Sequence, residues 1–325
     1  MSCRGLSLMS GGLDSQLAIR VLQRAGAEVE AVCFSTPFFD CTAAGKAAEA
    51  LGVKLHTVDF TDDELALIAD PPHGFGGAMN PCIDCHAAMI RRAGEMMVRM
   101  GYDFVATGEV MGQRPMSQNR QALGIVEKCS TLKGRLIRPL SAKLLEPTVP
   151  ETEGKLDREA LLDISGRSRE RQIALAAEFG LTDYPSPAGG CKLTEAGFCR
   201  KLRDLMDHEG LGNRRLVELL VVARRFRLPD GTGVVLGRDQ RENAVLKAID
   251  PAAWGLPQGL VFSPVNVPGP TAFLPEVRSA DDLRLAQTLC CAYSRFDRLE
   301  GEIRLTTGLV PRPYDRTFFK DFQIC

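Results

Sequence analysis

Two glycines flanked by hydroxyl and carboxyl side chains lie near the start of the chain, in the segment Ser10-Gly11-Gly12-Leu13-Asp14-Ser15. An apolar run precedes this segment and a helical pattern follows it. Glycines allow a backbone to approach an anion closely, and the N–H groups at the start of a helix bind phosphate. An ordinary capped turn would explain a lone glycine pair, but not this whole set of residues. The segment therefore predicts a phosphate-binding loop.

Thiols form the second group of residues that could carry chemistry. Cys82 and Cys85 make a C-x-x-C pair, and Cys191 follows a glycine pair much later in the chain. This spacing lets two thiols bind one metal or react with each other. With His86 the pattern also matches a haem attachment site, which we reject because the N-terminus has no signal-peptide core. Cys33 lies in an apolar run and is expected to be a core residue.

Composition sets limits on the class of protein. The chain has 325 residues, 45% of them hydrophobic, a net charge of −1 and eleven cysteines. This charge excludes a uniformly basic protein that coats nucleic acid. An odd cysteine count without an export signal argues against a disulfide scaffold. No apolar run reaches the ~18–20 residues of a membrane span, so we expect a cytoplasmic protein with no membrane association.

The first hundred residues alternate between strand-like and helix-like segments. The expected strands are residues 6–9, 29–34, 55–60 and 104–107, and the expected helices are residues 16–24, 43–51 and 87–100. This alternation predicts an α/β fold with a doubly wound, mainly parallel sheet, and a second, smaller α+β domain. Ligands of such sheets bind beyond the carboxyl ends of the strands, where the predicted phosphate loop lies.

The later part of the chain changes in character. Residues 147–156 are expected to form a loop and residues 163–179 a helix. Proline and glycine become frequent after residue 208, so we predict two domains, 1–207 and 208–325.

The Ser10–Ser15 segment resembles the S-G-G-x-D-S signature of the PP-loop ATP pyrophosphatase superfamily, whose fold is adenine nucleotide alpha hydrolase-like. It lacks the lysine of the common nucleotide-triphosphatase loop. The resemblance implies that ATP with Mg²⁺ is bound, that AMP is attached to a substrate oxygen and that pyrophosphate leaves. It also implies that ATP is contacted by Ser10, Gly11, Gly12, Asp14 and Ser15.

Further motifs resemble the tRNA thiouridine synthetases. Asn80-Pro-Cys-Ile-Asp-Cys85 resembles the tRNA 2-thiouridylases, and residues 108–118 and 138–140 resemble the 4-thiouridine synthetases. The resemblance implies ATP-dependent tRNA uridine thiolation, in which sulfur replaces an adenylated uracil oxygen. It assigns catalytic roles to Asp14, Cys82 and Cys191, and adds Gly108 and Gln113 to the ATP-binding residues.

Three thiols leave two sulfur-transfer mechanisms open. Cys191 could carry a persulfide that Cys82 resolves, with a persulfide carrier as the sulfur donor. Alternatively Cys82, Cys85 and Cys191 could ligate a [4Fe-4S] cluster with one open iron for hydrosulfide, which we favour because it uses Cys85. A zinc site that includes His86 is the weaker interpretation.

Arginines gather near the predicted domain boundary, at positions 200, 203, 214, 215, 224, 225 and 227. Each alone is best explained as part of a solvated helix face that is neutralised by nearby acids. As a group they could contact tRNA phosphates. Residues 237–243, 268–270 and 292–295 resemble the RNA-binding domain of the NFACT proteins, which makes tRNA the expected partner. A homodimer is left open.

Two other functions compete with tRNA thiolation. A PP-loop enzyme could adenylate a small metabolite, giving an amide or a thiolated product. The chain could also be a non-catalytic RNA-binding iron–sulfur protein, although the intact phosphate loop argues against loss of catalysis.

Overall fold

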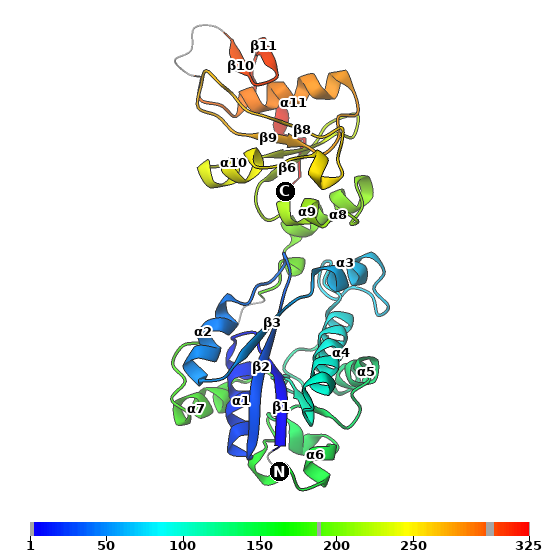
Figure 1. Cartoon of the computed structure of the whole chain (residues 1–325), viewed down its shortest axis with the longest axis vertical. Helices are drawn as coiled ribbons and strands as arrows, with labels where there is room; N and C mark the ends of the chain where they lie inside the picture. Colours follow the sequence, from blue (N-terminus) through cyan, green and yellow to red (C-terminus); the bar gives the residue numbers. More distant parts are fainter. Residues whose placement is uncertain (1–2, 187–189, 297–301, 325) are drawn as a thin grey trace. The chain divides into compact units, whose positions relative to one another are not determined.

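The computed structural model describes residues 3–186, 190–296 and 302–324. The chain divides between Thr194 and Glu195 into two compact units. Each unit has its own sheet, its own helices and its own buried core (Figure 1).

The N-terminal unit is built around a five-stranded parallel sheet with the order β3-β2-β1-β4-β5. Its strands are β1 (Cys3–Leu8), β2 (Ala27–Ser35), β3 (Leu55–Asp59), β4 (Phe104–Ala106) and β5 (Leu136–Ile137). The chain builds outward from β1 to β3 and then returns to place β4 on the other side of β1. The sheet is therefore doubly wound, as expected, and its direction of winding changes between β1 and β4.

Helices cover both faces of this sheet (Figure 1). One face carries α1 (Leu13–Arg24), α2 (Thr42–Leu51) and α7 (Glu170–Glu178), and the other carries α3 (Thr61–Ala69), α4 (Cys82–Met100) and α5 (Arg120–Ser130). Side chains alternate between the two cores: Ala31 packs in the α1 core, whereas Leu6 and Val32 pack in the α4 core. Burying a residue such as Leu17 of α1 contributes ~1.5–3 kcal/mol, and this fixes the helix that follows the phosphate loop.

Three sequence-based boundaries differ from the structure. Helix α4 begins at Cys82 rather than near Ala87. Pro81 is its N-cap, and a proline disfavours helical geometry in the residue before it, so the helix cannot extend further back. The segment 147–156, predicted as a loop, contains the short helix α6 (Val149–Thr152), which the capping box of Thr148 and Glu151 stabilises. The helix predicted over residues 163–179 is confined to α7.

The C-terminal unit is smaller and mainly antiparallel. Its five-stranded sheet has the order β12-β6-β7-β9-β8, and β10 and β11 form a separate hairpin. The strands are β6 (Arg224–Arg227), β7 (Gly233–Leu236), β8 (Leu260–Phe262), β9 (Ala272–Leu274), β10 (Ile303–Leu305), β11 (Gly308–Val310) and β12 (Gln323–Ile324). The helices are α8 (Ala196–His208), α9 (Arg214–Leu219), α10 (Gln240–Lys247) and α11 (Ala280–Ala292). The predicted second α+β unit is present.

Helix α8 belongs to the C-terminal unit, so the structural division lies thirteen residues before the predicted boundary at 207/208. Asp204 of α8 forms ion pairs with Arg225 and Arg227 of β6, at 2.6 Å and 2.7 Å. Helix α8 continues to His208, so the predicted boundary falls inside the last turn of this helix. Among the described residues, no helix is both long and apolar enough to cross a membrane.

Candidate active site

The predicted phosphate loop connects the end of β1 to the start of α1. Hydrogen bonds within the loop fix its shape: the Gly12 N–H donates to Ser10 Oγ at 3.3 Å, and Ser15 Oγ donates to the Gly12 carbonyl at 2.8 Å. Gly11 has a φ of +82°, and a Cβ there would lie 2.4 Å from the backbone of Ala43. Gly12 caps α1 without a side-chain acceptor, so no capping side chain covers the first N–H groups of the helix. This loop can accept an anion.

The segment that follows β4 packs directly on the phosphate loop. Gln113 Nε2 donates to Asp14 Oδ2 at 2.8 Å, and a Cβ at Gly108 would lie 2.7 Å from the Asp14 carbonyl carbon. The other carboxylate oxygen of Asp14, Oδ1, is buried and has no hydrogen-bond partner in the described structure. The structure thus brings together the residues predicted to bind ATP, namely Ser10, Gly11, Gly12, Asp14, Ser15, Gly108 and Gln113. The unpartnered oxygen suits a hydrated cation such as Mg²⁺.

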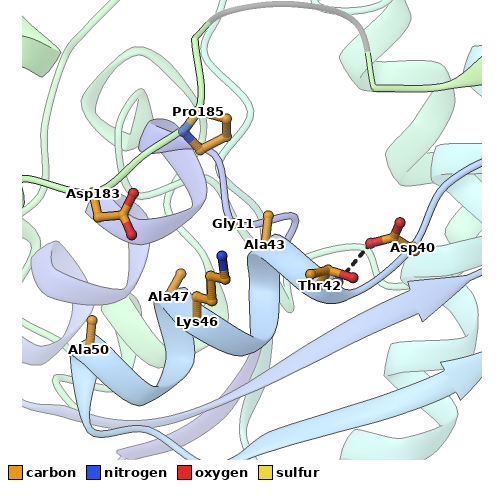
Figure 2. Close-up of a pocket in the computed structure, with 9 residues that line it drawn as sticks. All are labelled: Gly11, Asp40, Thr42, Ala43, Lys46, Ala47, Ala50, Asp183 and Pro185. Atoms are coloured by element: carbon orange, nitrogen blue, oxygen red, sulfur yellow. Dashed lines mark hydrogen bonds between the residues drawn. The ribbon is translucent and has the colours of Figure 1, made fainter.

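A cavity of about 330 Å³ borders the phosphate loop at Gly11 (Figure 2). The Lys46 side chain extends from α2 into this cavity, and Asp40 and Asp183 add carboxylates to its lining. Gln16 of α1 links two lining residues by donating to the carbonyls of Gly11 and Asp183, at 2.9 Å and 3.0 Å. The sequence analysis did not identify Lys46, because a lysine on an alanine-rich helix is typical of a solvated face.

One hydrogen bond ties the Cys191 segment to the loop after β2, and a second ties it to the residues just before α4. The Lys192 N–H donates to the Phe38 carbonyl, and the Met79 N–H donates to the Leu193 carbonyl, each at 3.1 Å. Cys82 is the first residue of α4, and Cys85 lies one turn further along the same helix. Burial raises the pKa of the Cys85 thiol well above its usual value, and the charges of Glu64, Cys191 and Cys82 act in the same direction. The three predicted thiols therefore share one neighbourhood.

The thiols are not arranged around a vacant metal position. Within residues 3–186, 190–296 and 302–324, no group of three or more His, Cys, Asp or Glu side chains is placed to hold a metal ion. Burial also raises the pKa of Cys82, so both α4 thiols favour the protonated form. Ligation would require these protons to leave and the side chains to converge.

Glu64 of α3 is a feature that the sequence analysis missed. Its side chain is fully buried, and neither carboxylate oxygen has a hydrogen-bond partner among the described residues. Burial raises the pKa of Glu64, whereas the neighbouring Cys85 and His86 lower it. Its position in an acidic first turn is typical of an exposed helix start, so no local pattern indicates its burial. A buried carboxyl beside the buried Cys85 thiol has polar atoms that a bound group could satisfy.

His86 belongs to a different set of contacts from the thiols. His86 Nδ1 lies 3.1 Å from Glu109 Oε1, and Glu109 Oε2 accepts from Thr107 Oγ1 at 3.0 Å and from Arg138 Nε at 2.9 Å. Although burial opposes ionisation, Arg138 and His86 lower the pKa of Glu109 to about 2. One ring nitrogen of His86 is thus engaged by Glu109, which further weakens the zinc interpretation.

Comparisons with known proteins agree with the resemblance predicted from the sequence. Residues 1–143 match the family model described as thiamine biosynthesis protein (ThiI). The chain is 23% identical to the tRNA-specific 2-thiouridylase MnmA of Marinobacter nauticus, in an alignment covering 92% of this chain and 80% of that protein. It is 28% identical to a probable tRNA sulfurtransferase of a Geobacillus species, over 43% of this chain and 35% of that protein.

A solved 4-thiouridine synthetase in complex with RNA and ATP matches 66% of this chain with 18% identity and a TM-score of 0.39. The sequence relatives confirm the resemblance to tRNA thiouridine synthetases, and the matched family region lies within the N-terminal unit. The chain spans 80% of the 2-thiouridylase but about a third of the sulfurtransferase.

Proposed function

We propose that this protein is an ATP-dependent tRNA thiouridine synthetase that acts in the cytoplasm. The observation that carries the proposal is the contact between the phosphate loop and the Gly108–Gln113 segment, in the same unit as three neighbouring thiols. An adenylating enzyme needs the phosphate loop, and a sulfur-transfer enzyme needs reactive thiols. The sequence relatives named for tRNA thiolation support the same conclusion.

The first chemical step forms a bond between a uracil carbonyl oxygen and the α-phosphorus of ATP and breaks the bond to pyrophosphate. The phosphate loop N–H groups and the start of α1 hold the leaving pyrophosphate. Gln113 orients the Asp14 carboxylate, whose second oxygen is left for the hydration shell of Mg²⁺. The metal ion would neutralise the negative charge that develops on pyrophosphate.

The second step replaces the adenylated oxygen by sulfur and releases AMP. We propose that Cys82, Cys85 and Cys191 hold a [4Fe-4S] cluster, with hydrosulfide as the sulfur donor. When bound, such a cluster supplies an iron with an open coordination position. The unpartnered Glu64 carboxyl beside Cys85 supports a bound group here, and the thiols must converge to hold it.

The persulfide route remains the alternative for the same thiols. The terminal sulfur of a Cys191 persulfide, supplied by a persulfide carrier, would attack the activated carbon and displace AMP. Cys82 would then attack the Cys191 sulfur, which releases the thiolated base and leaves a Cys82–Cys191 disulfide. A dithiol reductant would supply the two electrons that restore both thiols.

Mass spectrometry of tRNA nucleosides tests the proposed function. The full chain is incubated anaerobically, after reconstitution with iron and sulfide, with ATP, a tRNA transcript and hydrosulfide. We expect thiouridine and AMP in equal amounts. Gly12→Ala should lower both at least ~100-fold, because a Cβ would block close approach of pyrophosphate. Gly45→Ala on α2 is the matched control, since its Cβ meets no atom within 4 Å. AMP formation at the same rate with and without tRNA, and no thiouridine, would contradict the proposed function.

Substitution of single cysteines separates the two sulfur-transfer routes. With the cluster, alanine at Cys82, Cys85 or Cys191 should abolish thiolation and lower the iron content of the reconstituted protein. Cys129→Ala on α5 should leave both unchanged, and it provides the control. If Cys85→Ala keeps full activity while the Cys82 and Cys191 variants are inactive, the persulfide route replaces the cluster.

A further inference from the structure

Three of the seven arginines that the sequence places near the domain boundary pair with carboxylates within the C-terminal unit. Arg225 is buried and pairs with Asp204 and Glu209, and Arg227 pairs with the same two carboxylates. Arg214 pairs with Glu218 at 2.9 Å. These side chains stabilise the unit, and buried Arg225 and half-buried Arg227 are engaged by carboxylates rather than placed to contact phosphate.

Arg224 and Arg316 are held differently. Their guanidinium carbons lie 4.4 Å and 4.3 Å from the centre of the Tyr293 ring. Arg224 comes from β6, Tyr293 follows α11, and exposed Arg316 lies in the segment before β12, so three separate parts of the unit meet here. Within the described part of the chain, neither arginine forms an ion pair with a carboxylate. We call Arg224, Tyr293 and Arg316 the arginine–tyrosine cluster.

The electrostatic surroundings of the cluster are positive. The charge of Arg238 lowers the pKa of Arg224. Arg238 itself pairs with Glu242, which accepts a hydrogen bond from Arg238 Nε at 2.7 Å. Arg224 Nη2 donates to the Gly237 carbonyl at 2.8 Å, while its buried Nε has no partner in the described structure. Burial and the positive charges of Arg316 and Arg238 lower the pKa of Arg224, and Tyr293 and Glu242 act in the opposite direction. Among the described residues, Glu242 is the one carboxylate that forms an ion pair with any of these three guanidinium groups, and its partner is Arg238.

Packing fixes the position of the cluster. The Tyr293 ring meets the buried Phe226 ring edge-on, with 5.7 Å between centroids. Guanidinium groups stacked on a fixed ring lose less freedom when they bind an anion than free arginines do. The Gly237–Asn243 segment, which resembled an RNA-binding motif, supplies the neighbouring backbone and the Arg238–Glu242 pair.

We propose that the arginine–tyrosine cluster is a phosphate-contacting site for the tRNA backbone. This proposal rests on the proposed function for its choice of RNA as the partner. Guanidinium groups bind phosphate oxygens through paired N–H donors, and such contacts provide affinity without reading sequence. Two guanidinium groups without carboxylate partners among the residues that the structure describes are held side by side on the Tyr293 ring. This arrangement suits a polyanion with neighbouring phosphates better than it suits a single carboxylate on a protein partner.

Binding of a tRNA transcript to the full chain, measured by fluorescence anisotropy over a series of salt concentrations, tests this site. Arg316→Gln, Arg224→Gln and the double variant remove the charges. The double variant should bind ~10-fold more weakly at 0.1 M salt, and the slope of log affinity against log salt should fall by ~1.5, since each contact contributes ~0.7–0.9. Tyr293→Leu should also weaken binding, because it removes the platform.

Arg284→Gln is the matched control, since it removes an exposed arginine of the same unit that pairs with Asp281 at 3.2 Å. Arg316 makes no hydrogen bond in the described structure, so Arg316→Gln keeps the test valid if Arg224→Gln fails to fold. Wild-type affinity and slope in a folded Arg316→Gln variant and in a folded double variant would overturn the site.

Two further results separate this site from the proposed function. If the variants lose tRNA binding while the wild-type protein makes no thiouridine, the site stands and the proposed function fails. If thiouridine forms but the variants bind tRNA as the wild type does, the site is overturned and the proposed function stands. Binding to phosphatidylserine vesicles in place of tRNA, lost in the double variant, would overturn the choice of RNA.

Discussion

Three carboxyl groups near the candidate site occupy three different environments. Glu109 is fully paired, and its pKa is lowered to about 2. Glu64 is equally buried, its carboxylate oxygens have no hydrogen-bond partner in the described part of the chain, and burial raises its pKa although Cys85 and His86 act in the opposite direction. Asp14 is held through one oxygen by Gln113, while its other oxygen has no partner among the described residues. Glu109 therefore contributes to the stability of the fold. Glu64 and Asp14 each keep carboxylate oxygens that a bound ligand could coordinate or hydrogen-bond.

Replacing Glu109 should mainly affect stability. Glu109→Gln removes the charge that Arg138 faces in the interior, and breaking such a buried pair costs about 3–5 kcal/mol of unfolding free energy. Glu127→Gln is the control: Glu127 is a more exposed partner of the same arginine, at 3.4 Å, and should cost less than about 1 kcal/mol. Urea denaturation at pH 7 measures both. Equal losses in the two variants would contradict the central role of Glu109.

The same carboxyl gives the stability a dependence on pH. Because folding lowers the pKa of Glu109 from 4.5 to about 2, the folded state holds the proton less tightly than the unfolded state. Its contribution is complete above the unfolded pKa and is lost as pH falls from about 5 toward 2. Urea unfolding between pH 7 and pH 3 should therefore show a shallower loss of stability for Glu109→Gln than for the wild type. Parallel curves would contradict this assignment.

At the scale of elements, α8 depends on the strand that it packs against. Asp204 on α8 and Glu209 just beyond it neutralise Arg225 and Arg227 of β6. Asp204→Asn should cost about 3 kcal/mol or more, because it leaves buried guanidinium groups short of negative charge. Asp207→Asn makes the same charge change at an exposed position of the same helix and should be nearly neutral. The thermal unfolding transition of the C-terminal unit measures both variants.

The sequence predicted the elements that have strong local patterns. The β-α alternation predicted the parallel sheet, and the phosphate loop lies before α1 as expected, whereas α4 begins five residues earlier than predicted and so includes the C-x-x-C pair. Contacts between distant segments left no local signal. The burial of Glu64, the pairing of Asp204 with β6 and the stacking of Arg316 on Tyr293 all depend on tertiary packing. The predicted domain boundary differed for the same reason, since the partners of α8 lie later in the chain.

At the scale of the whole molecule, the two proposed tasks lie in different units. The phosphate loop, the Gly108–Gln113 segment and the three thiols all lie before Glu195, whereas the arginine–tyrosine cluster lies after it. Separate cores allow each unit to keep its shape without sharing side chains. Removing the C-terminal unit should therefore lower RNA affinity and leave ATP binding intact.

Cutting the chain at two nearby positions tests this division. A fragment of residues 1–194 contains every predicted ATP-binding residue and should bind an ATP analogue with an affinity within about threefold of the full chain, measured by calorimetry. A fragment of residues 1–207 carries α8 without β6, which exposes Phe198, Leu202 and Leu205; each contributes ~1.5–3 kcal/mol when buried. That fragment should bind the dye ANS and aggregate on heating. Equal dye binding by the two fragments, or loss of ATP-analogue binding by a folded 1–194 fragment, would contradict the assignment of α8 and of the ATP site.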